Sequence, residues 1–111
     1  FADNYRSKVK CWQERLAHIA HCGQKAVIWG GGSKGVTFLN TLRVSEQIKY
    51  VVDVNPHKQG RYIPGTGQKI VPSVFLASYR PDVIIVMNQN YLSEIERRAK
   101  ELQVEAELFV V

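Results

Sequence analysis

The chain has 111 residues, of which 45% are hydrophobic and 23% are charged, a composition typical of one ordinary globular domain. Its formal net charge of +5 suits an anionic ligand or an acidic neighbouring domain, but it is too small to indicate nucleic-acid binding. No apolar run approaches the roughly 20 residues needed to cross a membrane, and no secretory signal is present. We therefore expect neither nucleic-acid nor membrane partners.

The two cysteines, Cys11 and Cys22, form neither a disulfide framework nor a zinc motif. A reducing cytoplasm is therefore the expected location. The chain begins at Phe1 rather than at a methionine, and we expect it to be part of a longer protein.

Residues 3–22 have the periodicity of an amphipathic helix that Gly23 ends. Its predicted buried stripe contains Tyr5, Val9, Trp12, Leu16, Ile19 and Ala20. We assign residues 1–24 to an N-terminal helix that connects to a missing upstream domain, and residues 25–111 to the main domain.

A second face of this helix carries Cys11, His18 and Cys22. Cys11 and His18 would lie about 10 Å apart along the axis, too far to hold one ion. At most His18 and Cys22 could act together as ligands, and we predict no metal site.

A glycine cluster follows the first predicted strand, residues 25–29. Gly30, Gly32 and Gly35 have G-x-G-x-x-G spacing, and a helical pattern runs from Ser33 to about Arg43. A second strand, residues 48–52, then ends at Asp53. This layout predicts the first β-α-β unit of a dinucleotide-type fold, with helix N–H groups available to a phosphate. Alternatively, the glycines serve only the turn and the helix packing.

Three side chains near this unit are candidate ligand contacts, each with a structural alternative. Ser33 either caps the helix and also contacts a ligand or caps the helix alone, and Lys34 either lies near a phosphate or is simply solvated. Asp53 either accepts hydrogen bonds from ribose hydroxyls or caps the turn that follows it.

The segment between Asp53 and Ile70 departs from a standard nucleotide fold, because its prolines and glycines exclude a crossover helix. It carries Lys58, Arg61 and Lys69 but no acidic residue, so we predict a basic loop near the carboxyl edge of the second strand. These cations and Tyr62 are candidate ligand contacts. The alternative is a solvated loop whose charge has no role.

The remaining pattern predicts a short strand at residues 70–71, a short helix or turn at 72–78, and a buried strand at 83–87. A last helix, capped by Asn90, and a closing strand at 106–111 follow. We predict an α/β, Rossmann-like three-layer domain with a parallel five-stranded sheet in the order 3-2-1-4-5. That order brings residues 30–35 opposite Asn88, Asn90 and Tyr91, which could bind a base or sugar.

Several of these segments resemble the C-terminal domain of the S-adenosylmethionine-dependent nucleotide-sugar C-methyltransferases. The resemblance covers residues 25–111. It rests on the glycine turn, on Val52-Asp53-Val54-Asn55-Pro56, on Pro81 to Asn88, and above all on Gly60-Arg61-Tyr62-Ile63-Pro64-Gly65-Thr66-Gly67-Gln68-Lys69.

This resemblance implies a substrate-side domain that binds a nucleotide-sugar and is inactive alone. In the family, a zinc-binding module and a central domain with the catalytic base and methyl donor precede this one. S-adenosylmethionine is thus expected in the full-length enzyme, and no cofactor is assigned to this fragment. Two alternatives stay open: an NAD-binding module of an oxidoreductase or regulator, which Asp53 favours, and a structural lid with a vestigial site.

Overall fold

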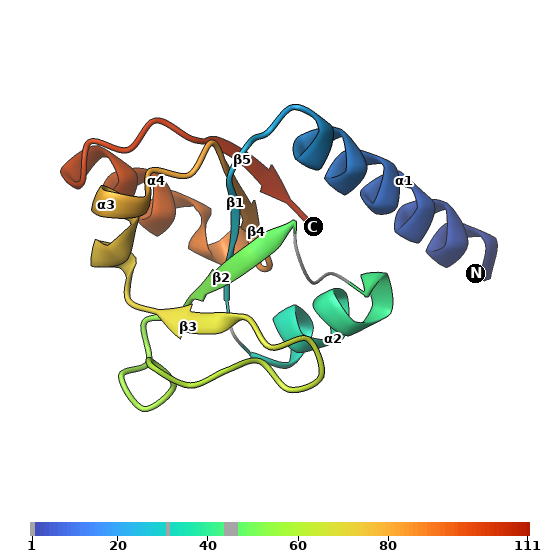
Figure 1. Ribbon diagram of the computed structural model, residues 1–111, viewed down its shortest axis with the longest axis horizontal. Coiled ribbons are helices and arrows are strands. Elements are labelled where there is room, and N and C mark those ends of the chain that lie inside the picture. The colour runs from blue at the N-terminus through green and yellow to red at the C-terminus, as the bar shows by residue number, and fades with distance from the viewer. Residues whose placement is uncertain (1, 31, 44–46) are drawn as a thin grey trace.

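A five-stranded parallel sheet forms the centre of the domain (Figure 1). The computed structural model describes residues 2–30, 32–43 and 47–111, with side chains from residue 6 onward. The strand order is β3-β2-β1-β4-β5, which confirms the predicted topology. The strands are β1 (Ala26–Trp29), β2 (Ile48–Val52), β3 (Lys69–Val71), β4 (Val83–Val86) and β5 (Glu107–Val110).

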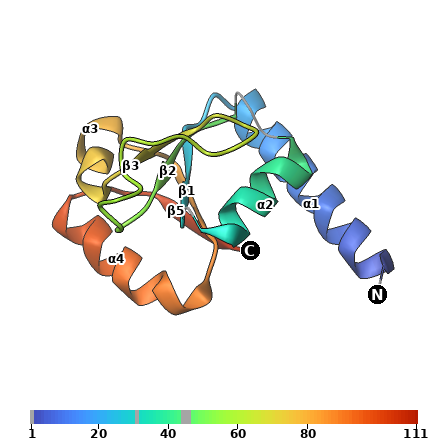
Figure 2. The same ribbon diagram turned by 90° about the horizontal axis from the view of Figure 1, so that it is seen from below.

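Helices cover both faces of this sheet (Figure 2). One face carries α1 (Ala2–His21) and α2 (Ser33–Leu42), and the other carries α3 (Leu76–Tyr79) and α4 (Leu92–Glu101). Two 3₁₀ turns, η1 (Ser73–Phe75) and η2 (Gln89–Tyr91), lead into α3 and α4. The predicted three layers and the N-terminal helix are therefore confirmed.

Side chains of β1 alternate between the two faces. Ala26 and Ile28 belong to the core under α1 and α2, whereas Val27 and Trp29 belong to the core under α3 and α4. All four are buried. A strand covered on both faces reads as a continuous apolar run, and this is why β1 and β4 were recognisable in the sequence.

Helix α1 packs on the domain through one stripe. Trp12, Leu16 and Ile19 are buried, and the Trp12 ring meets the Phe38 ring of α2 edge-on at 5.3 Å between centroids. Two members of the predicted buried stripe are not buried: Val9 is half-buried and Ala20 is exposed. The Tyr5 side chain lies outside the described residues. The stripe thus contributes to the same core as β1 and α2.

The segment after Asp53 ends in a hairpin that covers the outer edge of β3. Gly60 N donates to Ile70 O and Ile70 N donates to Arg61 O, both at 2.8 Å, and Ile63 N donates to Gln68 O at 2.8 Å. Tyr62 and Lys69 form an antiparallel bridge. Backbone groups that β3 would otherwise leave unpaired are therefore bonded within the chain.

This hairpin is fixed to helix α2. Asn40 Nδ2 donates to Pro64 O at 3.0 Å, and an added Cβ at Gly65 would overlap Asn40 Oδ1. Gly65 also has a φ of +88°, which side-chain-bearing residues rarely adopt. Buried Ile63 belongs to the core, and buried Gln68 donates to Ile48 O. Much of the Gly60–Lys69 motif therefore has a structural role.

Tyr79 provides a test of the α3 face at high pH. Burial raises the pKa of its phenol above the ordinary 10.0, and Tyr50 and Asp82 raise it further. The unfolded chain therefore loses this proton at lower pH than the folded chain. The stabilisation that comes from the protonated Tyr79 is complete below pH 10 and is lost as pH rises through the higher pKa of the folded state.

We expect Tyr79→Phe to lose less stability than the wild type when the pH rises from 9 to 11, a range of about two units around the ordinary tyrosine pKa. Urea midpoints at both pH values measure this, with exposed Tyr62→Phe as the control. An identical loss in wild type and Tyr79→Phe would contradict it.

Candidate functional site

A cavity of about 380 Å³ opens at the carboxyl ends of β1, β2 and β4, where the strand order reverses. We call it the carboxyl-edge pocket. In open α/β sheets, ligands bind at this place. Its walls are Trp29, Gly30, Gly32, Ser33, Lys34, Gly35, Asp53, Val54, Asn55, Lys58, Met87, Asn88, Tyr91 and Glu94.

The pocket brings together nine of the predicted site residues, from three segments of the chain, residues 30–35, 53–58 and 88–91. These are Gly30, Gly32, Ser33, Lys34, Gly35, Asp53, Lys58, Asn88 and Tyr91. Arg61, Tyr62, Lys69 and Asn90, all within the described part of the chain, do not line it. Their ligand contacts stay predictions.

Five wall residues were not among the candidates. Trp29 ends β1, Met87 directly follows β4, and Val54 and Asn55 directly follow Asp53. Their positions beside recognised strand ends were a usable signal. Glu94 lies on α4, three residues after Tyr91. Its place in the pocket wall depends on how α4 packs against the sheet, which the sequence does not reveal.

Two of the three motif glycines are required by the fold itself. Gly30 has a φ of +124°, and a Cβ there would approach Met87 Cβ at 3.2 Å. A Cβ at Gly35 would overlap the carbonyl oxygen of Gly30. The start of α2 can therefore lie against the end of β1 only because position 35 has no side chain.

Gly32 has no such requirement. A Cβ at this position would meet nothing within 4 Å, and its φ of −81° is ordinary for any residue. Gly32 is the N-cap of α2, and no side chain caps it. The prediction that Ser33 caps this helix was wrong, because Ser33 is the first residue of α2 and the N-cap position before it is Gly32. Gly32 thus has open space beside it, and it lines the carboxyl-edge pocket.

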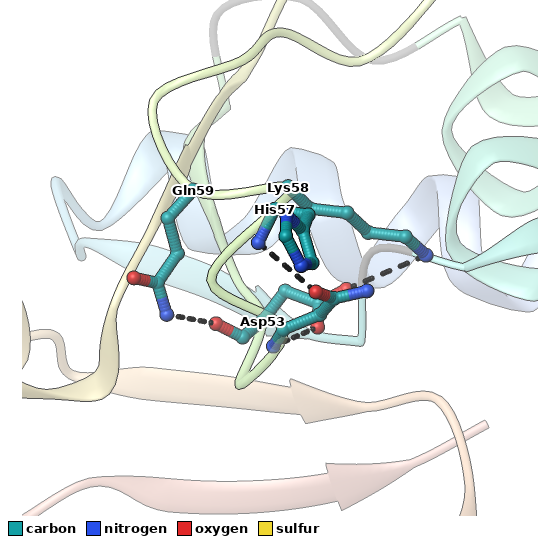
Figure 3. Close-up of polar contacts among 5 residues, drawn as sticks. Asp53, His57, Lys58 and Gln59 are labelled. Atoms are coloured by element: carbon teal, nitrogen blue, oxygen red, sulfur yellow. Dashed lines mark hydrogen bonds and ion pairs between the residues drawn. The ribbon is translucent and has the colours of Figure 1, made fainter.

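Asp53 organises the turn that follows β2 (Figure 3). Its Oδ1 accepts from Asn55 N at 2.9 Å, its backbone O accepts from Gln59 Nε2 at 2.9 Å, and Lys58 Nζ lies 3.8 Å from its Oδ2. Asp53 therefore caps its own turn, one of the two roles considered for it. Its predicted contact with ribose stays a prediction.

The predicted basic loop divides into two parts. Lys58 reaches the pocket, and its charge faces the carboxylate of Asp53. Lys69 begins β3, at the amino end of that strand, and Arg61 and Tyr62 lie in the hairpin beside it. Tyr62 is 63% exposed. The loop cations therefore do not form one cluster at the carboxyl edge.

The opposite wall of the pocket comes from the turn after β4. Asn88, rather than Asn90, provides the cap here: Asn88 Oδ1 accepts from Asn90 N at 2.9 Å. The predicted N-cap at Asn90 was wrong because a 3₁₀ turn precedes α4: Asn88 caps that turn, and the N-cap residue of α4 itself is Tyr91. Tyr91 is 45% exposed, which leaves much of its ring accessible at the mouth of the pocket.

Comparison with protein families identifies the chain. A family model described as C-methyltransferase C-terminal domain matches residues 1–111. The chain belongs to this family. A search of curated proteins found no match.

Solved structures with a similar fold include a Rex-family repressor, RSP. RSP alone aligns with the C-methyltransferase domain at a TM-score of 0.59 and 16% identity, over 88% of this chain and 58% of that chain. RSP in complex with beta-NADH aligns at a TM-score of 0.57 and 16% identity, over 79% and 53%. The domain thus spans little more than half the length of these structures, and the likeness shows the fold.

A sugar-nucleotide enzyme is also similar in fold. UDP-D-quinovosamine 4-dehydrogenase from Vibrio fischeri aligns at a TM-score of 0.56 and 14% identity, over 79% of the C-methyltransferase domain and 77% of that chain.

Among the described residues, no three or more His, Cys, Asp or Glu side chains come together as possible metal ligands. The one pair named from the sequence does meet, with Cys22 Sγ 3.5 Å from His18 Nε2 at the exposed end of α1. In the same residues, no helix is both long and apolar enough to span a bilayer.

Proposed function

We propose that this C-methyltransferase domain binds a nucleotide-sugar in the carboxyl-edge pocket, as the substrate-side domain of an S-adenosylmethionine-dependent enzyme. An upstream domain of the same protein would supply the methyl donor and the catalytic base. The observation that carries the proposal is that Gly32 at the start of α2 lines the same cavity as Asp53, Asn88 and Tyr91, with open space beside Gly32 itself. We further propose a cytoplasmic protein without nucleic-acid or membrane partners, in keeping with the two free thiols, Cys11 and Cys22.

The diphosphate would lie at the start of α2. The first N–H groups of a helix have no partner within it, and the helix dipole makes that end favourable for an anion. With no Cβ at Gly32, a phosphate oxygen can approach the backbone closely. Lys34 and Lys58 line the same pocket and would add charge-assisted contacts.

The nucleoside would lie toward β2 and η2. Tyr91 offers an accessible ring face for stacking, and Asn88 offers an amide within the same wall. A ribose at Asp53 would have to share its carboxylate with Lys58 and with Asn55 N. This arrangement supports binding through phosphate and base more than through the ribose hydroxyls.

NAD is the second candidate ligand, because Asp53 ends β2 at the place where an acid binds ribose in dinucleotide folds. The fold neighbour RSP was solved with beta-NADH. Residues 54–68, all of them described, contain turns and a hairpin instead of a helix. They therefore lack the crossover helix that usually completes an adenosine pocket.

Calorimetry decides between these ligands. We expect UDP-glucose to bind this domain at least about tenfold more tightly than NAD, a difference of about 1.4 kcal/mol. Tighter binding of NAD would favour the second candidate. Gly32→Ala should weaken UDP-glucose binding, because its new methyl group would project into space that the phosphate needs.

Methyl transfer provides a separate prediction. The pocket wall includes the carboxylates of Asp53 and Glu94 beside its cations, amides and tyrosine, but the proposal assigns both the donor site and the base to another domain. We expect this chain, incubated with methyl-labelled S-adenosylmethionine and UDP-linked keto-sugars, to transfer no label above background. Product that accumulates in proportion to the amount of domain would refute this division of labour.

A further inference from the structure

The end of α1 brings an imidazole and a thiol together. Cys22 Sγ lies 3.5 Å from His18 Nε2 and 3.9 Å from His18 Nδ1. The two residues are four positions apart, the spacing at which helical side chains lie above one another on one face. Both are exposed. An imidazole nitrogen and a thiolate sulfur are ligands that Zn²⁺ prefers in proteins.

The separation of the two donor atoms matches one tetrahedral ion. A Zn–S bond of about 2.3 Å and a Zn–N bond of about 2.0–2.1 Å, at the tetrahedral angle, place sulfur and nitrogen about 3.6 Å apart. The 3.5 Å between Cys22 Sγ and His18 Nε2 is close to this value. The pair therefore already has the spacing that a shared ion requires.

The backbone of this turn is held in place. Cys22 N donates to His18 O at 2.9 Å, so the helical register continues through Cys22. Gln24 N donates to the carbonyl of buried Ile19 at 3.0 Å, which ties the turn to the core. The dipole of α1 also favours positive charge at this end of the helix. The turn is thus preorganised for a cation.

The surrounding charges leave the pair accessible to a cation. Lys25, the lysine closest to the pair in sequence, donates its ammonium to Tyr79 O at 3.2 Å. Exposed Glu14 lies about one helical turn before His18 and adds a negative charge on this stretch of the helix. Within the described part of the chain, no third His, Cys, Asp or Glu joins the pair.

We propose that His18 and Cys22 form a two-ligand site for Zn²⁺, with water in the remaining coordination positions. The thiol releases its proton to solvent when its sulfur binds the ion, and the complex keeps a net positive charge. This inference departs from the prediction of no metal site, because the sequence does not show the separation of the donor atoms. It is independent of the proposed function, since neither residue lines the carboxyl-edge pocket.

Titration of the reduced chain with Zn²⁺ against a chromophoric chelator tests the site. We expect one ion per chain. Cys22→Ser and His18→Gln should each weaken binding by at least about tenfold, since loss of an outer-shell partner alone usually costs that much. Mg²⁺ in excess should not compete, because it prefers oxygen ligands.

The same helix provides matched controls. Cys11 is also an exposed thiol, but the residue four positions after it is Arg15. His21 is exposed and precedes Cys22 directly, and successive helical residues point about 100° apart. Cys11→Ser and His21→Gln should therefore bind Zn²⁺ as the wild type does. All four variants change exposed residues and should fold normally.

Co²⁺ in place of Zn²⁺ reports the thiolate bond directly. We expect a thiolate-to-cobalt charge-transfer band that is lost in Cys22→Ser and kept in Cys11→Ser. Equal weakening of Zn²⁺ binding by these two variants would show unspecific thiol binding and overturn the site. A wild-type cobalt complex without the band would overturn ligation by Cys22, and one ion per two chains would overturn the water-filled positions.

Discussion

Gly35→Ala is expected to lower the free energy of unfolding of this domain by at least about 2 kcal/mol, in the upper range for overpacking. The added Cβ would overlap the carbonyl oxygen of Gly30, which is backbone and cannot rotate away. Gly30 is itself held at the end of β1, because its N–H donates to Val52 O at 2.8 Å. Relief of the overlap would therefore separate α2 from the sheet. Urea unfolding measures the loss.

Gly32→Ala is the matched comparison, because the same methyl group is added three residues earlier in the same motif. The open space there predicts a cost of no more than about 1 kcal/mol, mostly from the weaker N-cap preference of alanine. Gly35→Ala should therefore lose stability, whereas Gly32→Ala should lose ligand affinity. Equal destabilisation by both would contradict the open space at Gly32.

Trp12→Ala is expected to lower the free energy of unfolding by about 3–5 kcal/mol, a large part of the 5–15 kcal/mol typical of a domain. The indole is 6% exposed and packs against Phe38, Phe109 and the Arg15 guanidinium. Truncation leaves a cavity between α1, α2 and β5 that these neighbours cannot fill.

Exposed Cys11 is the control for Trp12, since it is the preceding residue of the same helix. Cys11→Ala should change the free energy of unfolding by no more than about 0.5 kcal/mol. A loss below 1 kcal/mol in Trp12→Ala would mean that α1 is a connecting helix and contributes little to the core, and would contradict the packing described above.

The sheet could be predicted from the sequence because its signals are local. β1, β2 and β4 are short apolar runs, and the spacing of Gly30 to Gly35 placed the first turn and helix correctly. Right-handed crossovers then left few strand orders to consider. The strand order also fixes the place of the carboxyl-edge pocket, and this is why most of the predicted site residues line that pocket.

The helix caps and the loop could not be predicted as well. Ser33 and Asn90 were plausible caps by residue type, but backbone geometry placed the caps at Gly32 and Asn88 instead. The positions of Arg61 and Lys69 depend on pairing between residues 60–63 and β3, a long-range choice that charge does not reveal. The cavity of about 430 Å³ between α1 and α2 depends on how these two helices pack, for which the sequence holds no simple signal.

The hairpin on β3 also determines where another strand could pair with this sheet. Residues 60–63 pair with β3 along one border of the sheet, so a foreign strand cannot pair directly with β3 there. At the other border, β5 is the last strand within the described part of the chain. Glu105 and Glu107 lie exposed at its start. Protection against aggregation is thus built from backbone on one side and from charge on the other, so neutral residues in place of Glu105 and Glu107 would weaken the second side alone.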